Sequence, residues 1–205
     1  MAVYDARKLT KLAGNVRDWD SKINSAAANA LNRAATKARN DSVSEIFNRT
    51  TLSGSYVKER LTVAGRASPS NLRSIVQGVN RATLLSRFDY IKTSAGVKVK
   101  VNNRGGFKLI KDSFVVTNLR GSTSTGIAMS NVRAAAYYAD AAIGGGSQAV
   151  KRKAIKLAIK AKTKPGGIHV LHSRSITQLF ESVKVDVSPS VQLFLERTFL
   201  DNLGR

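Results

Sequence analysis

Residues 96–106 read Gly-Val-Lys-Val-Lys-Val-Asn-Asn-Arg-Gly-Gly. Three valines alternate with two lysines and an asparagine, which is the period of a β-strand that has one buried and one exposed face. The Asn-Asn-Arg-Gly-Gly run has the composition of a hairpin turn, and Phe107-Lys-Leu-Ile can return as the partner strand. This stretch predicts an antiparallel β-hairpin.

Short strand-like segments surround the hairpin. Residues 61–64, 72–76 and 83–88 precede it and residues 113–118 follow it, each bounded by Gly, Ser, Pro or Asn. We therefore expect residues 61–120 to form a mainly antiparallel sheet.

A long helix is predicted before the sheet, from Val16 to Phe47. Its apolar residues recur at spacings of three and four, and most of them are alanines, which let another backbone approach closely. We expect this face to lie against the sheet or against a neighbouring subunit. The candidate subunit-packing residues are Trp19, Ile23, Ala27, Ala30, Ala34 and Ala38. A short helix ending near Arg60 follows.

The second half of the chain alternates glycine-rich breaks with short elements. Residues 121–126 and 144–147 are turn-like, residues 132–142 are helix-prone, and Val150 to Lys162 has the pattern of a basic amphipathic helix. A strand at 168–171, a helix at 175–183 and a strand at 183–187 come next. A final helix is then expected, with Ser188 as its N-cap and Pro189 in its first turn.

These elements predict an α+β fold, with a long N-terminal helix packed on a mainly antiparallel sheet and a C-terminal helix. The length of 205 residues suits a single domain. Within it, residues 121–166 are expected to form an insertion or extended basic arm.

The chain is strongly basic. Its 34 Lys and Arg against 13 Asp and Glu give a net charge of +21, while residues 167–205 hold four of each sign. Such an excess points to an acidic partner. The absence of cysteine excludes disulfides and thiolate metal sites. No apolar run approaches the roughly 18 residues of a membrane span, so no membrane partner is expected.

Catalytic patterns are absent from the sequence. His169 and His172 lack neighbouring metal ligands, and residues 144–147 are not followed by the Lys and Ser/Thr of a phosphate-binding loop. A nuclease would require Glu59, Asp89 and Asp112 to converge on a metal ion. We expect no enzymatic activity, no metal and no cofactor.

Two groups of basic residues are candidates for contact with DNA or with an acidic protein. Few aromatic residues lie among them, so contact with phosphates is favoured over stacking on bases. The candidates are Lys98, Lys100, Arg104, Lys108 and Lys111 around the hairpin, and Lys151, Arg152, Lys153, Lys156 and Lys160 on the basic helix.

Three stretches, taken in order, resemble the prophage minor tail protein Z family, the tail-completion proteins of lambda-like phages. The first runs from Ala30-Leu-Asn-Arg-Ala-Ala into Tyr56-Val-Lys-Glu-Arg-Leu-Thr-Val. The second contains Leu84-Leu-Ser-Arg-Phe, the Gly96-Val-Lys-Val-Lys-Val strand and residues 107–114. The third is Ser175-Ile-Thr-Gln-Leu-Phe with the final helix, where Ser175 stands in place of the family's usual proline.

The resemblance implies a late structural protein of the virion, assembled in the host cytoplasm. It would form a homo-oligomeric ring, expected to be a hexamer, at the head-proximal end of the tail. Its implied partners are the tail terminator, tail tube and head-closure proteins, and the ring would line or adjoin the DNA channel. The alternative is a sequence-nonspecific nucleic-acid-binding protein.

Overall fold

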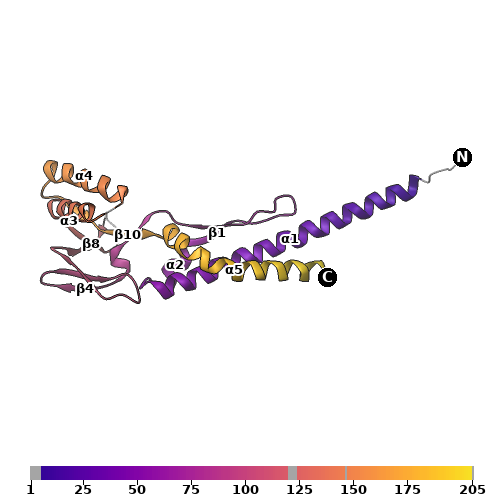
Figure 1. The fold of residues 1–205 in the computed structure, drawn as a ribbon, viewed down its shortest axis with the longest axis horizontal. Helices are drawn as coiled ribbons and strands as arrows, with labels where there is room; N and C mark the ends of the chain where they lie inside the picture. The colour runs from indigo at the N-terminus through magenta and orange to yellow at the C-terminus, as the bar shows by residue number, and fades with distance from the viewer. Residues whose placement is uncertain (1–5, 120–123, 146, 205) are drawn as a thin grey trace. The chain divides into compact units, whose positions relative to one another are not determined.

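The computed structural model of the chain describes residues 6–119, 124–145 and 147–204, and the side chains from residue 19 onward within these ranges. The described residues form an α+β fold, as predicted, with a long N-terminal helix, several antiparallel sheets and a C-terminal helix (Figure 1). The helices are α1 (Ala6–Arg49), α2 (Gly54–Arg60), α3 (Asn131–Ile143), α4 (Gln148–Thr163) and α5 (Ile176–Leu203).

Four small antiparallel sheets are present in the described ranges, with strand orders β1-β2, β10-β3, β4-β5-β6 and β7-β8-β9. A 3-10 turn, η1 (Leu85–Arg87), follows β3. The strands are β1 (Leu61–Gly65), β2 (Ile75–Gly78), β3 (Ala82–Leu84), β4 (Asp89–Thr93), β5 (Gly96–Lys100), β6 (Lys108–Lys111), β7 (Phe114–Val116), β8 (Gly126–Ser130), β9 (Ile168–Val170) and β10 (His172–Ser175).

The chain divides into two compact units. Unit 1 contains residues 1–46, 54–80 and 176–205, and unit 2 contains residues 47–53 and 81–175. Each unit buries its own set of apolar side chains. The assignment of residues 1–205 to one domain stays a prediction.

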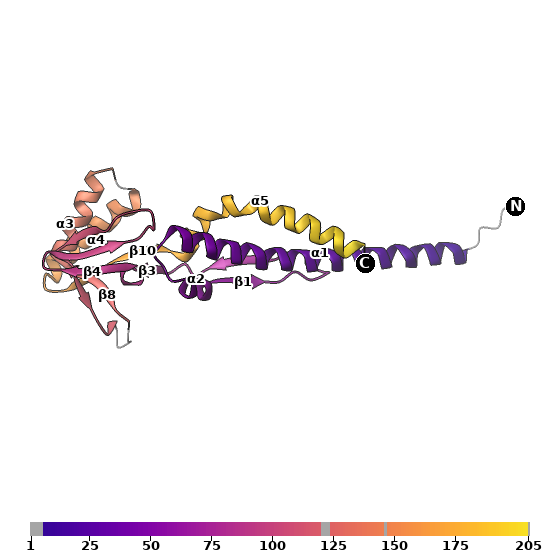
Figure 2. The same cartoon turned by 90° about the horizontal axis from the view of Figure 1, so that it is seen from below.

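Unit 1 is built around α1, which is 44 residues long. Asn32 and Arg39, seven residues apart, both face the β1-β2 hairpin, where the Arg39 Nε donates to the Leu61 carbonyl at 2.7 Å. On another side α5 runs antiparallel to α1, since Ser190 contacts Asp41 while Asn202 contacts Ala26 (Figure 2). The small alanines of α1 allow both elements to approach it closely.

Helix α5 corrects two predictions. The expected strand at 183–187 and the expected helix start at Ser188 both lie inside one continuous helix of 28 residues, with Pro189 in its interior. Proline has no N–H to donate there. The hydroxyls of Ser188 and Ser190, on either side of the proline, donate to the carbonyls of Lys184 and Val187, at 2.6 and 3.0 Å.

Unit 2 contains the predicted hairpin. β5 and β6 pair in antiparallel register, with Val97 opposite Ile110 and Val99 opposite Lys108, and the valines face the core. The turn between the strands has a second role, because the Asn103 side chain donates to the carbonyls of Phe47 and Asn48 at 2.8 and 3.1 Å. These carbonyls belong to the last turn of α1, so Asn103 caps that helix end.

The predicted arm, residues 121–166, contributes to the core of unit 2. β8 is the middle strand of its sheet, and its Ile127 and Met129 side chains are buried. Ser130 caps α3 by accepting from the backbone N–H of Arg133. The expected turns at 121–126 and 144–147 lie partly outside the described residues, and the status of this segment as an insertion stays a prediction.

Candidate functional site

The basic residues of the hairpin lie on both faces of the β4-β5-β6 sheet. Lys98 pairs with Ile91 on one side and with Leu109 on the other, and paired residues share a face. Lys100 and Lys111 lie on the same face by the two-residue period. We call the five residues Ile91, Lys98, Lys100, Leu109 and Lys111 the sheet patch. It combines lysines with two exposed aliphatic side chains.

Lys108 departs from the predicted arrangement. Its backbone pairs with Val99, so its side chain starts from the opposite, core-facing side of the sheet. There it lines a pocket of about 300 Å³ together with Tyr137 and His172. The fifth candidate, Arg104, lies exposed in the turn. The sequence interpretation groups Lys108 with the outward-facing Lys98 and Lys100. The strand register places it on the opposite side of the sheet, and its role as a contact residue stays a prediction.

Helix α4 presents the second basic surface. Leu157 is buried against the rest of unit 2, whereas Lys151, Arg152, Lys156 and Lys160 are exposed. Lys153 differs from these four. Its Nζ donates to the Tyr138 hydroxyl of α3 at 2.7 Å and lies 4.1 Å from the centre of that ring. Lys153 therefore joins α4 to α3 and is only partly accessible to a partner.

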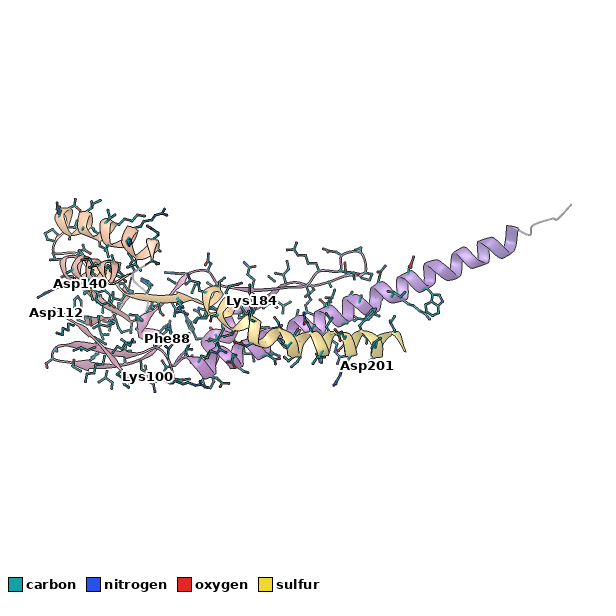
Figure 3. The ribbon with its side chains drawn as sticks, viewed as in Figure 1. Phe88, Lys100, Asp112, Asp140, Lys184 and Asp201 are labelled. Atoms are coloured by element: carbon teal, nitrogen blue, oxygen red, sulfur yellow. The ribbon has the colours of Figure 1, made fainter. Side chains whose placement is uncertain are left out.

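The hairpin lysines and the basic residues of α4 lie on different parts of unit 2. Within unit 2, α4 packs on α3, and the sheet that contains β4 lies on the other side of α3 (Figure 1). Between β6 and α3 is a pocket of about 320 Å³ lined by Lys111, Asp112, Arg133 and Asp140, among others (Figure 3). Asp112, isolated in the sequence, forms an ion pair with Arg133 at 3.4 Å.

The two other carboxylates named in the nuclease hypothesis lie on separate elements. Glu59, on α2, is 3.3 Å from the guanidinium of Arg60, and Asp89 begins β4. Among the described residues, no group of three or more His, Cys, Asp or Glu side chains could hold a metal ion. The absence of enzymatic activity stays a prediction.

His169, on β9, is the most perturbed titratable side chain described. Its ring makes an edge contact with Tyr138 at 5.8 Å between centroids, and its Nε2 is buried with no hydrogen-bond partner. Burial, helped by the nearby positive charges of Lys153 and Lys160, lowers the pKa of His169 to about 4. His169 is therefore neutral in the folded protein at neutral pH.

Replacing His169 with phenylalanine should reduce the acid sensitivity of the fold. An unfolded histidine takes up a proton below about pH 6.5, while the folded one resists until about pH 4, so wild-type stability falls as the pH drops through this window. We expect His169→Phe to remove about 1–2 kcal/mol of the stability loss between pH 7.5 and pH 5. Denaturant unfolding at both values measures it. An unchanged pH dependence in His169→Phe would contradict the expectation.

The candidate subunit-packing residues on α1 have different accessibilities. Ala30 and Ala34 are buried inside unit 1, so they cannot contact another subunit while the unit is folded. Ala27 and Ala38 are partly buried. Trp19 and Ile23 are exposed and line a pocket of about 440 Å³ at the end of α5. The two exposed members of this set, Trp19 and Ile23, lie at its N-terminal end, and subunit packing stays a prediction.

Two features of the structure are not indicated by any local sequence pattern. Asn32, on α1, accepts from the Ala67 N–H at 2.8 Å and donates to the Ala67 carbonyl at 2.9 Å. The outer side of α5 carries exposed Val185, Leu193 and Leu200. The second pattern is visible only once residues 176–203 are treated as one helix.

The described helices include none that is long and apolar enough to cross a membrane. Comparison of the chain with models of protein families, with curated proteins and with solved structures gives no match. The similarity to the minor tail protein Z family therefore rests on the three sequence stretches alone.

Proposed function

We propose that this protein is a structural tail-completion protein of a tailed bacteriophage, which forms a ring at the head-proximal end of the tail and joins tail to head. The observation that carries the proposal is the order of the three family-like stretches. They fall on α1 to β1, on η1 to β7, and on the start of α5. The succession of long helix, antiparallel strands and terminal helix is consistent with that order.

The distribution of charge supports the proposal. A neck ring touches the genome as it passes and also contacts other tail proteins, and both are suited by surfaces that carry excess Lys and Arg. Unit 2 holds two such surfaces, the sheet patch and the outer side of α4. The aliphatic side chains within both surfaces favour protein as at least one of the contacts, because phosphates offer no apolar surface.

A nonsense mutation in the gene, placed in a phage that carries it, is the direct test. We expect DNA-filled heads and complete tails that fail to join, seen by electron microscopy as separate particles, with joining restored in a suppressor host. Purified virions of the wild type should contain the protein. Normally joined virions that lack the protein would contradict the proposal.

A nonspecific nucleic-acid-binding role remains the second candidate because α4 carries six basic and no acidic side chains. Each phosphate neutralised by such a surface makes affinity fall with salt. Binding to DNA of unrelated sequences with a steep salt dependence, together with no binding to tail proteins, would favour this candidate over the tail protein.

A further inference from the structure

Helix α5 has an apolar stripe on its outer side that no described residue covers. Ile176, Leu179, Val183 and Val187 are buried on its inner side. Val185, Leu193 and Leu200 are 71%, 58% and 65% exposed. These three residues are separated by eight and seven positions, about two turns each, so they lie along one side of the helix.

The outer side of α5 also carries negative charge. The helix holds four acidic and two basic side chains, a net charge of −2 in a protein of +21. Glu196 lies between Leu193 and Leu200 on the exposed side. The exposed Arg197 lies beside Glu196, so this surface is an apolar stripe on a helix whose net charge is −2.

Helix α4 has the complementary surface. Ile155 and Ile159, one turn apart, are 63% and 60% exposed on the side opposite the buried Leu157. Arg152 and Lys162, three residues before and three after, extend the same side. The helix holds six basic and no acidic side chains. An isoleucine pair at the centre of this surface suits a protein partner better than phosphates.

We propose that the outer side of α4 in one copy of this chain binds the outer side of α5 in a second copy. The contact would bury both apolar stripes and bring Arg152 and Lys162 near Glu196. An α4-to-α4 contact would place two basic surfaces against each other, so repulsion disfavours it.

The contact uses two different surfaces. A row of associated copies therefore always has a free α4 surface at one end and a free α5 surface at the other. Such heterologous association continues until it closes into a ring. The proposal thus supplies a subunit contact for the ring of the proposed function. It rests on that function only for the expectation that the associated copies close into a ring.

Two double variants test the contact. Arg152→Glu/Ile155→Glu disables α4 and leaves α5 intact, whereas Glu196→Lys/Leu200→Lys disables α5 and leaves α4 intact. All four positions are exposed, so both variants should keep the wild-type circular dichroism. In sedimentation velocity we expect oligomers for the wild type and monomers for each variant alone. An equimolar mixture should give a dimer of one copy of each, and nothing larger.

The matched control changes the sheet patch in the same way. Lys98→Glu/Leu109→Glu also introduces two acidic residues at exposed positions of unit 2, and it should leave the oligomer unchanged. Loss of the oligomer in this control would either place the contact at the sheet patch or show sensitivity to charge alone, and each would overturn the proposal.

Other outcomes would also overturn it. A wild-type protein that is monomeric at all concentrations has no such contact, and variants whose mixture stays monomeric place the contact elsewhere. If the α4 variant keeps its oligomer and loses DNA binding, α4 is a nucleic-acid surface. If the mixed variants form the expected dimer but virions without the protein are normally joined, the contact between α4 and α5 stands and the proposed neck function is contradicted.

Discussion

Replacing Gly96 with alanine is expected to unfold much of unit 2. Gly96 has φ of 139°, a conformation that side chains other than glycine rarely adopt, and an added Cβ would lie 2.2 Å from the Ile110 carbonyl oxygen. That oxygen belongs to the backbone of β6, so relief of the overlap would separate β5 from its partner. Backbone strain and overpacking together should cost about 2–6 kcal/mol. Denaturant unfolding and amide exchange in β4, β5 and β6 measure the loss.

Gly106, in the turn of the same hairpin, is the matched control. A Cβ on Gly106 would meet nothing within 4 Å. Gly106→Ala should change the free energy of unfolding by less than about 1 kcal/mol. Equal stability of the two variants would show that the close approach at Gly96 does not exist in solution.

Replacing Asn32 with alanine is the second change expected to have a large effect, and it acts on unit 1. The amide of Asn32 satisfies both the N–H and the carbonyl of Ala67, a residue that is 8% exposed and has little access to water. Losing both bonds leaves two shielded backbone groups without partners, at a cost of about 2–4 kcal/mol. Denaturant unfolding and amide exchange in the β1-β2 hairpin measure the effect.

Two further variants serve as controls for Asn32→Ala. Asn29→Ala, an exposed asparagine on the same helix, should change stability by no more than about 0.5 kcal/mol. Asn32→Asp keeps the acceptor for the Ala67 N–H but sets a carboxylate against the Ala67 carbonyl, so it should be at least as damaging as alanine. If Asn32→Asp were as stable as the wild type, the paired hydrogen bonds would not be holding the hairpin.

The hairpin at 96–111 could be predicted because strand period, turn composition and register agree there. Residues 183–187 were predicted wrongly because Val-Lys-Val-Asp-Val has a strand period and β-branched residues. In a strand, all three valines would share a face. In the structure, Val183 and Val187, four positions apart, are buried and Val185 is exposed, which is the helical period. Packing within unit 1 outweighs the local preference.

The candidate surfaces were predictable in composition but not in detail. The sequence alone identifies the lysines of α4. It does not show that Lys153 differs from the others, because that difference depends on its hydrogen bond to Tyr138 on a neighbouring helix. The side to which Lys108 points depends on a register with Val99 that no local pattern encodes. The role of Asn32 likewise depends on Ala67, which lies 35 positions away.

Unit 1 is assembled from segments on both sides of unit 2 in the chain, and this sets the order of events during synthesis. Domains tend to fold as units while the chain emerges from the ribosome. Unit 2 is complete in the chain once Ser175 has emerged, whereas α1 must wait for α5 before its remaining apolar side is covered. A chain that stops before α5 would therefore contain a folded unit 2 and an α1 that is not covered by α5. Unit 1 can be completed only after α5 has emerged from the ribosome.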